Sequence, residues 1–254
     1  MKCQLLTHFM FILDMIAERL TRKVAEYSLK RRASCSVSVY PLKADKLAQQ
    51  GYLTREVVRQ DGKMWDVISD APQSTEFAIS RFLTPILHKR STGVSGWVLF
   101  VDCDVLFLDD ITNLTSLLDD QYAVMCVKHQ YKPKMGQKMD AQLQTVYARK
   151  NWSSVMAFNC DHPANDRLTL EMVNSLPGRD LHRFCWLEDG EIGELPKEWN
   201  ALIGEDGYDI DTAKIAHYTL GGPWFEPFYG DTSGLPLSDR LWLDEECDML
   251  LHRE

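Results

Sequence analysis

The segment Trp97–Phe107, which reads WVLFVDCDVLF, constrains the fold of this chain more than any other stretch. Its first five residues, Trp97–Val101, are all apolar, as in a strand that is buried on both faces of a parallel sheet. Parallel strands need long crossover connections, usually helices, so the segment favours an α/β fold. Asp102 and Asp104 follow at the carboxyl end of this strand, where sheets of this kind bind their ligands.

The rest of the chain alternates between helical and extended patterns. Apolar residues recur at helical spacing in Ile16–Arg31, Ser74–Lys89, Ile111–Leu118 and Asn165–Ser175. Pro85 stands inside the second of these, so we expect a kink or a helix end near it. Short apolar or alternating runs predict strands at Phe9–Leu13, Cys35–Tyr40, Tyr122–Val127, Val155–Phe158 and Ala213–Tyr218. These patterns predict a mostly parallel central sheet flanked by helices, with a polar hairpin or excursion at Gly51–Asp70.

Composition excludes some classes of function. The chain has 254 residues and a formal net charge of −9, so its overall field repels phosphates. A non-specific nucleic-acid binder usually carries a basic excess, and we therefore expect no nucleic-acid partner. An acidic protein can still bind phosphate groups through local cations or a metal ion.

Cysteine usage and the first residues bear on the compartment. The seven cysteines are odd in number and contain no CxxC pair, which favours a reducing environment over a disulfide framework or a zinc site. The apolar stretch at the N-terminus is interrupted by His8 and Asp14 and is too short to span a bilayer. We interpret it as a first core strand, and we expect a cytoplasmic protein without a transmembrane segment.

Asp102 and Asp104 carry the clearest chemistry. Two carboxylates two residues apart at a strand end can bind one divalent cation, and their hard oxygen ligands suit Mg²⁺ or Mn²⁺. Such an ion can bridge to a diphosphate and neutralise a leaving group. Two other interpretations stay open: a solvated strand end, or a HAD-type phosphatase with Asp102 as its nucleophile. In those phosphatases the motif usually stands near the start of the domain, whereas about a hundred residues precede it here.

Three residues far from this motif in sequence could complete such a site. His217 lies in KIAHYTLGGPWF and could be a third metal ligand or a core histidine. Gly222 follows in the same segment, where glycine would let the backbone approach a phosphate closely. Arg81 stands among apolar residues before the Trp97–Val101 strand, so it predicts a buried ion pair with a carboxylate or a contact with a phosphate.

Five further residues are candidates for contacts with a substrate. Lys128 ends a predicted strand and either lines the cleft or leaves the core. Ser153 and Ser154 open another strand, and their hydroxyls either bind sugar hydroxyls or satisfy a turn. Glu188 and Asp189 are candidate carboxylates near a transferred sugar, with charged turn residues as the alternative.

Taken in order, these segments resemble the GT-A glycosyltransferases, and most of all family 8, the glycogenin and lipopolysaccharide galactosyltransferase group. The resemblance covers most of the chain from Asp14 to Trp224 and rests on the order of its motifs. The matching segments are SRFLTPIL, LFVDCDVLF, WSSVMAFN, an acidic stretch before LPKEWN, and HYTLGGPW. The family commonly has Lys before Pro-Trp, whereas this chain has Gly222.

The resemblance implies a Rossmann-like GT-A fold, a UDP-sugar donor and Mn²⁺. It implies that Asp102, Asp104 and His217 ligate the metal and that Arg81 contacts the donor. It also implies transfer with retention of anomeric configuration. The acceptor, whether glycan, lipid or protein, is not specified by the sequence.

We therefore expect one GT-A-like catalytic domain over residues 1–254, with a nucleotide-binding half at about 9–128, an acceptor- and sugar-binding half at about 129–230, and a C-terminal tail at 231–254. The expected function is metal-dependent transfer of a hexose from a nucleotide-diphosphate sugar. The alternatives are the HAD-like phosphatase and a non-catalytic carbohydrate-binding relative.

Overall fold

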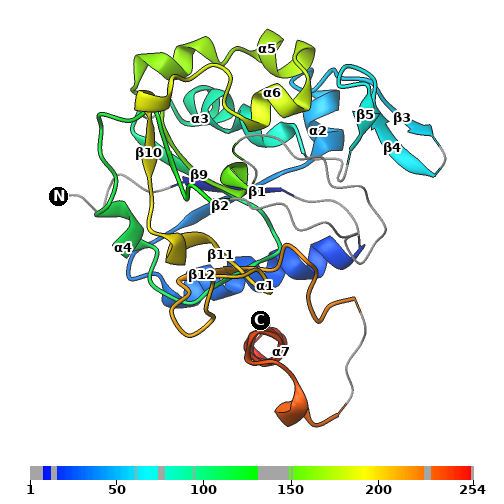
Figure 1. Cartoon of the computed structure of the whole chain (residues 1–254), viewed down its shortest axis with the longest axis vertical. Coiled ribbons are helices and arrows are strands. Elements are labelled where there is room, and N and C mark those ends of the chain that lie inside the picture. Colours follow the sequence, from blue (N-terminus) through cyan, green and yellow to red (C-terminus); the bar gives the residue numbers. More distant parts are fainter. Residues whose placement is uncertain are drawn as a thin grey trace.

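One six-stranded sheet organises the computed structural model, which describes residues 8–12, 16–60, 62–73, 78–93, 95–130, 149, 151–225 and 230–252 (Figure 1). The strand order is β10-β8-β9-β6-β1-β2, and β9 alone among these six strands runs antiparallel to the others. The strands are β1 (His8–Ile12), β2 (Ser38–Leu42), β6 (Trp97–Val101), β8 (Val124–Cys126), β9 (Val155–Asn159) and β10 (Ile192–Glu194). The predicted mostly parallel central sheet is confirmed.

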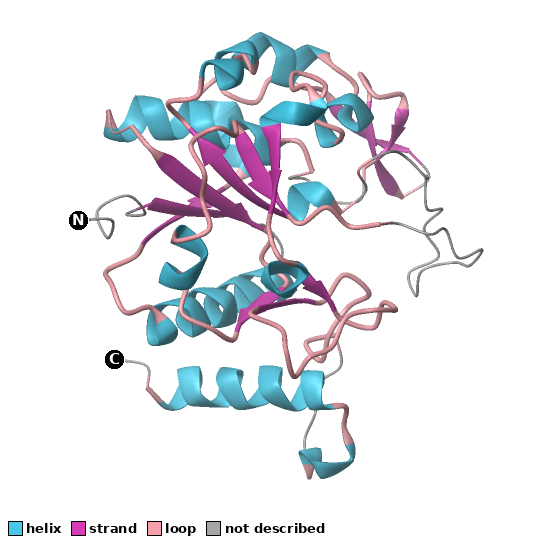
Figure 2. Ribbon diagram, turned by 60° about the vertical axis from the view of Figure 1, so that its left-hand side comes forward, coloured by secondary structure: helices cyan, strands magenta, loops and turns pink. Residues whose placement is uncertain are grey.

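Helices cover both faces of this sheet, as the fully apolar β6 requires (Figure 2). The helices are α1 (Ile16–Arg32), α2 (Ala44–Gln49), α3 (Thr84–Thr92), α4 (Thr112–Thr115), α5 (Leu170–Ser175), α6 (Gly178–His182) and α7 (Leu237–Leu251). Side chains alternate along β6, so that Val98 and Phe100 join the core beneath α3 while Leu99 and Val101 join the core beneath α1. Both cores reach the carboxyl end of β6, and they fix the point from which Asp102 departs.

A smaller sheet lies next to that end of β6. It consists of β7 (Val105–Phe107), β11 (Ala201–Leu202) and β12 (Ile215–His217) in the order β11-β12-β7. β7 follows Asp104 directly and runs antiparallel to β12, which places His217 opposite Val105. This pairing carries a residue from late in the chain to the strand end where the two carboxylates lie.

The segment expected as a C-terminal tail contains a long helix, α7, that lies against α1 (Figure 1). Trp242 on α7 is fully buried. Across the same interface, Arg32 donates to Glu245 at 2.8 Å, and the Tyr27 hydroxyl donates to Asp248 at 2.9 Å. Residues 237–251 therefore form part of the packed structure.

A third sheet forms the excursion predicted at Gly51–Asp70. Its strands are β3 (Val57–Gln60), β4 (Lys63–Asp66) and β5 (Ala71–Pro72), all antiparallel. Arg55 ties this sheet to the body, because its guanidinium pairs with the buried Asp66 and donates to the carbonyls of Val173 and Leu176.

Two predicted helices are divided in the structure. Instead of one helix over Ser74–Lys89, the chain forms the 3₁₀ helix η1 (Ser80–Leu83) and then α3, because Pro85 fits only the first turn of a helix. The sequence offers Ser74 or Thr75 as the cap of the longer helix, and both lie outside the described residues. The predicted helix Asn165–Ser175 becomes η3 (Pro163–Arg167) and α5, since Thr169 is extended and caps α5 by accepting from the Met172 amide at 3.1 Å.

Four other 3₁₀ turns connect these elements: η2 (Trp152–Ser154), η4 (Asp189–Glu191), η5 (Lys197–Asn200) and η6 (Thr232–Gly234). Of these, η2 leads into β9, and η5 joins β10 to β11. Across the described ranges, the model contains no helix with the length and apolar character needed to cross a bilayer.

Candidate metal and donor site

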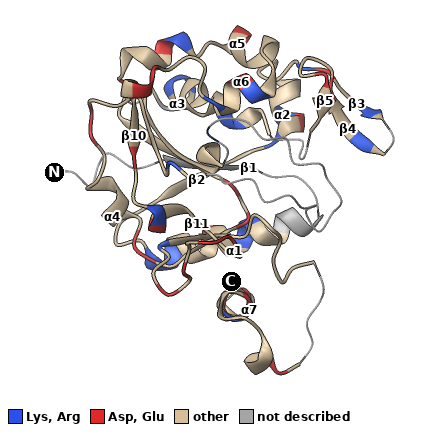
Figure 3. Cartoon of the chain, in the orientation of Figure 1, with Lys and Arg blue, Asp and Glu red and all other residues tan. Residues whose placement is uncertain are grey.

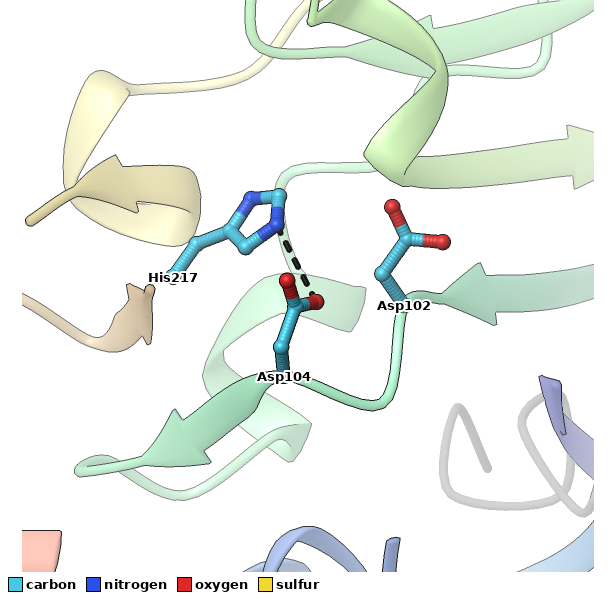
Figure 4. A group of neighbouring side chains, drawn as sticks. All are labelled: Asp102, Asp104 and His217. Atoms are coloured by element: carbon cyan, nitrogen blue, oxygen red, sulfur yellow. Dashed lines mark ion pairs between the residues drawn. The ribbon is translucent and has the colours of Figure 1, made fainter. Parts of the chain in front are cut away.

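Asp102, Asp104 and His217 point toward one another at the carboxyl end of β6 (Figure 4). Each offers one ligand atom, and these atoms all lie within 4.8 Å of one another. The His217 Nε2 atom is 3.2 Å from an oxygen of Asp104. The predicted grouping of these three residues is present, and two carboxylates with one imidazole form a ligand set suited to Mn²⁺.

Backbone hydrogen bonds hold the three residues in place. The Asp102 amide donates to the Ser154 carbonyl at 2.9 Å, which ties the end of β6 to η2. The Tyr218 amide donates to the Asp104 carbonyl at 2.9 Å, which extends the pairing of β12 with β7 beyond His217. Each candidate ligand therefore stands on a strand end fixed by its neighbour.

Arg81 is the electrostatic partner of Asp102, as the sequence predicted. Its two terminal nitrogens lie 3.0 and 3.1 Å from the two oxygens of Asp102, a bidentate arrangement. Nη1 also donates to the Ser153 carbonyl at 2.8 Å, and the guanidinium carbon lies 5.1 Å from the centre of the Phe100 ring. This places a buried positive charge beside the cluster, from the side of η1.

The charges of the cluster influence one another. Burial raises the pKa of Asp102, and Asp104 adds to this, although Arg81 opposes both. Burial would also raise the pKa of Asp104, but His217 beside it lowers the pKa below its usual value. Burial acts to lower the pKa of His217, whereas Asp104 raises it more strongly. A cation bound here would displace the proton that a charged His217 directs from Nε2 toward Asp104, because metal ligands must be deprotonated.

The hydroxyls of Ser153 and Ser154 are engaged within the protein. Ser153 Oγ lies 2.7 Å from His182 Nδ1, and Ser154 Oγ donates to the Asn151 carbonyl at 2.9 Å. Both residues are buried. Their contact with a donor stays a prediction, and in this structure their visible role is to join η2 to other segments.

Lys128 and Gly222 also have structural partners. The Lys128 ammonium donates to the Ile192 carbonyl at 2.8 Å and lies 5.8 Å from the centre of the Trp152 ring. At Gly222, a side chain would meet the ring of Trp224 at 2.2 Å, so packing alone requires glycine there. Contacts of either residue with a phosphate remain predictions.

The structure does not bring Glu188 and Asp189 to the cluster. They directly precede β10, whose first residue, Ile192, lies opposite Val124 at the amino end of β8. Asp102 leaves the opposite, carboxyl end of the sheet. Asp189 is almost fully exposed and pairs with Arg149, and Glu188 begins the turn η4. The order of the segments in the sequence did not show whether these carboxylates lie at the amino or the carboxyl ends of the parallel strands.

Sequence reasoning missed a group of polar residues behind His217. Asn200 is fully buried, and its Oδ1 atom lies 2.9 Å from His217 Nδ1. Its Nδ2 atom donates to His129 Nε2 and to Ser154 Oγ, each at 2.9 Å. His129 in turn hydrogen-bonds the Tyr208 hydroxyl. The one signal in the sequence is an amide that follows Trp199 directly, between two apolar residues.

Two cavities lined by both polar and apolar residues lie elsewhere. One, of about 560 Å³, lies between β2, α2 and α3, and the other, of about 200 Å³, lies beside Arg149 and Arg183. Neither is lined by Asp102, Asp104 or His217. The cluster is therefore described by its side chains and not by an enclosed cavity.

No family model matches the chain. It is 45% identical over 232 residues to Protein CDI of Arabidopsis thaliana, a match that spans 90% of this chain and 82% of that protein. The structure resembles the glycosyltransferase GlyE of Streptococcus pneumoniae TIGR4, with a TM-score of 0.55, 15% identity and 97% of this chain covered. The chain spans only 62% of GlyE.

A second solved structure matches at nearly equal length. It is the galactosyltransferase LgtC in complex with donor and acceptor sugar analogues, with a TM-score of 0.55, 15% identity and 95% of each chain covered. At these identities the likeness concerns the fold, which is the GT-A fold predicted from the sequence.

Proposed function

We propose, from the premise that this chain belongs to the same family as Protein CDI of Arabidopsis thaliana and has the GT-A fold, that it is a metal-dependent glycosyltransferase. It transfers a hexose from a nucleotide-diphosphate sugar, most suitably a UDP-sugar, to a glycan, lipid or protein acceptor. Transfer retains the anomeric configuration, as the resemblance to family 8 implies.

The observation that carries this proposal is the Asp102–Asp104–His217 cluster with Arg81 beside it. Two carboxylates and one imidazole suit Mn²⁺, and Asp102 and Asp104 are both partly exposed, so that a diphosphate can reach the ion they hold. Bound there, the metal supplies positive charge to the departing nucleoside diphosphate.

Arg81 contributes in two ways. Its bidentate pairing keeps the two Asp102 oxygens at a fixed position, which preorganises the ligand set. Its positive charge also lies beside the cluster, where it would help to stabilise the charge of a diphosphate held by the metal. We assign no residue as catalytic base, because Glu188 and Asp189 lie toward the other edge of the sheet.

The phosphatase alternative is less consistent with this fold. Each Asp102 oxygen that accepts from Arg81 keeps a further lone pair, so this ion pair alone does not separate a nucleophile from a metal ligand, and the fold is the distinguishing observation. β6 pairs with the antiparallel strand β9 on one side, in a fold that matches glycosyltransferases. A non-catalytic relative that binds carbohydrate stays distinguishable by experiment.

The test is calorimetric titration of UDP into the protein with and without Mn²⁺. Wild type should bind UDP only with the metal, and Asp104→Ala should abolish that binding. Asp109→Ala is the matched control, because Asp109 lies just beyond β7 and pairs with Lys214 outside the cluster. Metal-independent UDP binding, or unchanged binding in Asp104→Ala, contradicts the proposal. Slow donor hydrolysis across a panel of nucleotide sugars then identifies the sugar, and its absence throughout favours the non-catalytic relative.

A further inference from the structure

Asn200 stands behind the proposed metal ligand His217, at the end of η5. Its side chain is fully buried, so every polar atom of the amide needs a partner within the protein. The carbonyl oxygen Oδ1 lies 2.9 Å from His217 Nδ1, and the two protons on Nδ2 have acceptors in His129 and Ser154, each at 2.9 Å. Both N–H donors and the carbonyl oxygen of the amide therefore each have a partner in one arrangement.

The partners of Nδ2 determine which way this amide faces. Ser154 Oγ donates its only proton to the Asn151 carbonyl at 2.9 Å, so it can only accept from Asn200. His129 presents Nε2 to the amide and Nδ1 to the Tyr208 hydroxyl. Burial, together with the charge of His217, lowers the pKa of His129 to about 3, so its ring is neutral. Because the NH₂ group that faces Nε2 can only donate, Nε2 is the acceptor of this ring.

Because two acceptors hold the NH₂ group, Oδ1 must face His217. A carbonyl oxygen can only accept, so the His217 Nδ1 atom carries the proton in this arrangement. When the ring is neutral, Nε2 has no proton. It then presents its lone pair to the space between Asp102 and Asp104, where Nε2 lies 3.2 Å from Asp104. Without Asn200, both tautomers and other ring orientations would be open to the imidazole.

We propose that Asn200 is a positioning residue that fixes the tautomer and the orientation of His217 for metal binding, with His129 and Ser154 fixing Asn200 in turn. The inference rests on the proposed function, since it concerns the same metal site. The hydrogen bonds of Asn200 join three separate segments to His217. These are η2 through Ser154, the residues after β8 through His129, and the loop after β11 through Tyr208, which contacts His129.

Mn²⁺ affinity, measured without nucleotide from the electron paramagnetic resonance signal of the free ion, tests this assignment. Hydrogen-bond partners behind a ligating histidine typically change metal affinity by about 10–100-fold. Asn200→Leu removes the acceptor at nearly constant volume and should raise the Kd for Mn²⁺ by about this factor. Asn200→Asp keeps an oxygen facing Nδ1 and should bind within a few-fold of wild type.

Asn165→Leu is the matched control for loss of a buried amide. Asn165 is also buried, and its Nδ2 atom donates to the carbonyls of Ala123 and Asn159 at 2.7 and 2.8 Å. It should lose stability as Asn200→Leu does but keep the wild-type Kd for Mn²⁺. Equal weakening in both variants would show a general structural effect and overturn the assignment.

The nitrogen resonances of His217 supply a measurement that needs no destabilising variant. Long-range proton–nitrogen spectra of the metal-free wild type, at a pH where the ring is neutral, should show protonation at Nδ1. His217→Gln assigns the signals, and protonation at Nε2 would overturn the inference even where Asn200→Leu does not fold.

The outcomes separate this inference from the proposed function. If wild type binds no Mn²⁺, the proposed metal site fails. If wild type binds Mn²⁺ and folded Asn200→Leu binds it equally well, only the positioning role fails.

Discussion

His182 offers the sharpest test of the electrostatics around the site. It lies at the end of α6, where its Nδ1 atom is 2.7 Å from Ser153 Oγ and its ring centre is 5.1 Å from that of Phe82. Burial, with Arg81 nearby, lowers the pKa of His182 to about 3, although a backbone hydrogen bond at Ala78 acts in the opposite direction. In the unfolded chain the pKa of a histidine is about 6.5.

The sign of the effect follows from proton uptake. Above about pH 6.5, His182 is neutral in both states and adds no pH dependence. As the pH falls below this value, the unfolded chain binds a proton that the folded protein refuses, so stability falls. Between pH 7.5 and 5.0 the loss amounts to about 2 kcal/mol. Any pKa of His182 below about 4 in the folded protein gives nearly the same loss of stability, because His182 is then neutral in the folded protein at pH 5.0.

The assay is urea unfolding of wild type and His182→Gln at both pH values, followed by tryptophan fluorescence in metal-free buffer. Wild type should lose about 2 kcal/mol more than the variant on acidification. His129 and His217 contribute to the pH dependence of stability in both proteins, so their contributions cancel when the two losses are compared. Equal losses, within about 0.5 kcal/mol, would show that His182 is protonated in the folded protein at pH 5.0 and refute the reasoning.

Two further predictions concern the elements that frame the site. Arg55→Met should destabilise the protein by about 3–5 kcal/mol in urea unfolding, because it leaves the buried Asp66 carboxylate without its guanidinium. The double variant with Asp66→Leu should recover part of this loss, and no recovery would contradict the explanation. Trp242→Ala should cost about 3–5 kcal/mol in the same assay, since Trp242 is fully buried in the core that α7 completes. A loss below about 1 kcal/mol would show that α7 unfolds separately.

The sequence predicted the site best where one local pattern determines one structure. Five consecutive apolar residues in β6 cannot be solvated on either face, so they predict a central strand, and Asp102 and Asp104 must then lie at its end. The ion pair of Arg81 was predictable for a similar reason, because a guanidinium among apolar neighbours needs a buried partner.

Strand direction could not be predicted in the same way. β9 is as fully buried as β6, yet it runs antiparallel, and nothing in five buried residues encodes direction. The same limit explains the placement of Glu188 and Asp189. They precede the first residue of β10, so their distance from the cluster depends on the direction of this strand, which its parallel pairing with β8 determines.

Hydrogen bonds between residues far apart in the sequence could not be predicted either. Ser153 and Ser154 were predicted either to contact a sugar or to satisfy a turn, and Ser154 does donate to the carbonyl of Asn151, three residues before it. The more distant partners of these hydroxyls could not be predicted. These partners, His182 and Asn200, are 29 and 46 residues away. A buried polar residue is recognised as such only after the fold has brought its partners together.

The negative net charge of the protein explains why a cation bound at the cluster would be needed to attract a diphosphate. A chain with a formal charge of −9 repels a diphosphate at long range, and Asp102 and Asp104 with Arg81 carry one net negative charge between them while His217 is neutral. A divalent cation reverses the sign of that local charge, which a monovalent lysine beside two carboxylates could not do. Under the proposed function, nucleotide binding should therefore depend on the metal, and loss of the hydrogen bond from His217 to Asn200 should weaken the binding of both metal and donor.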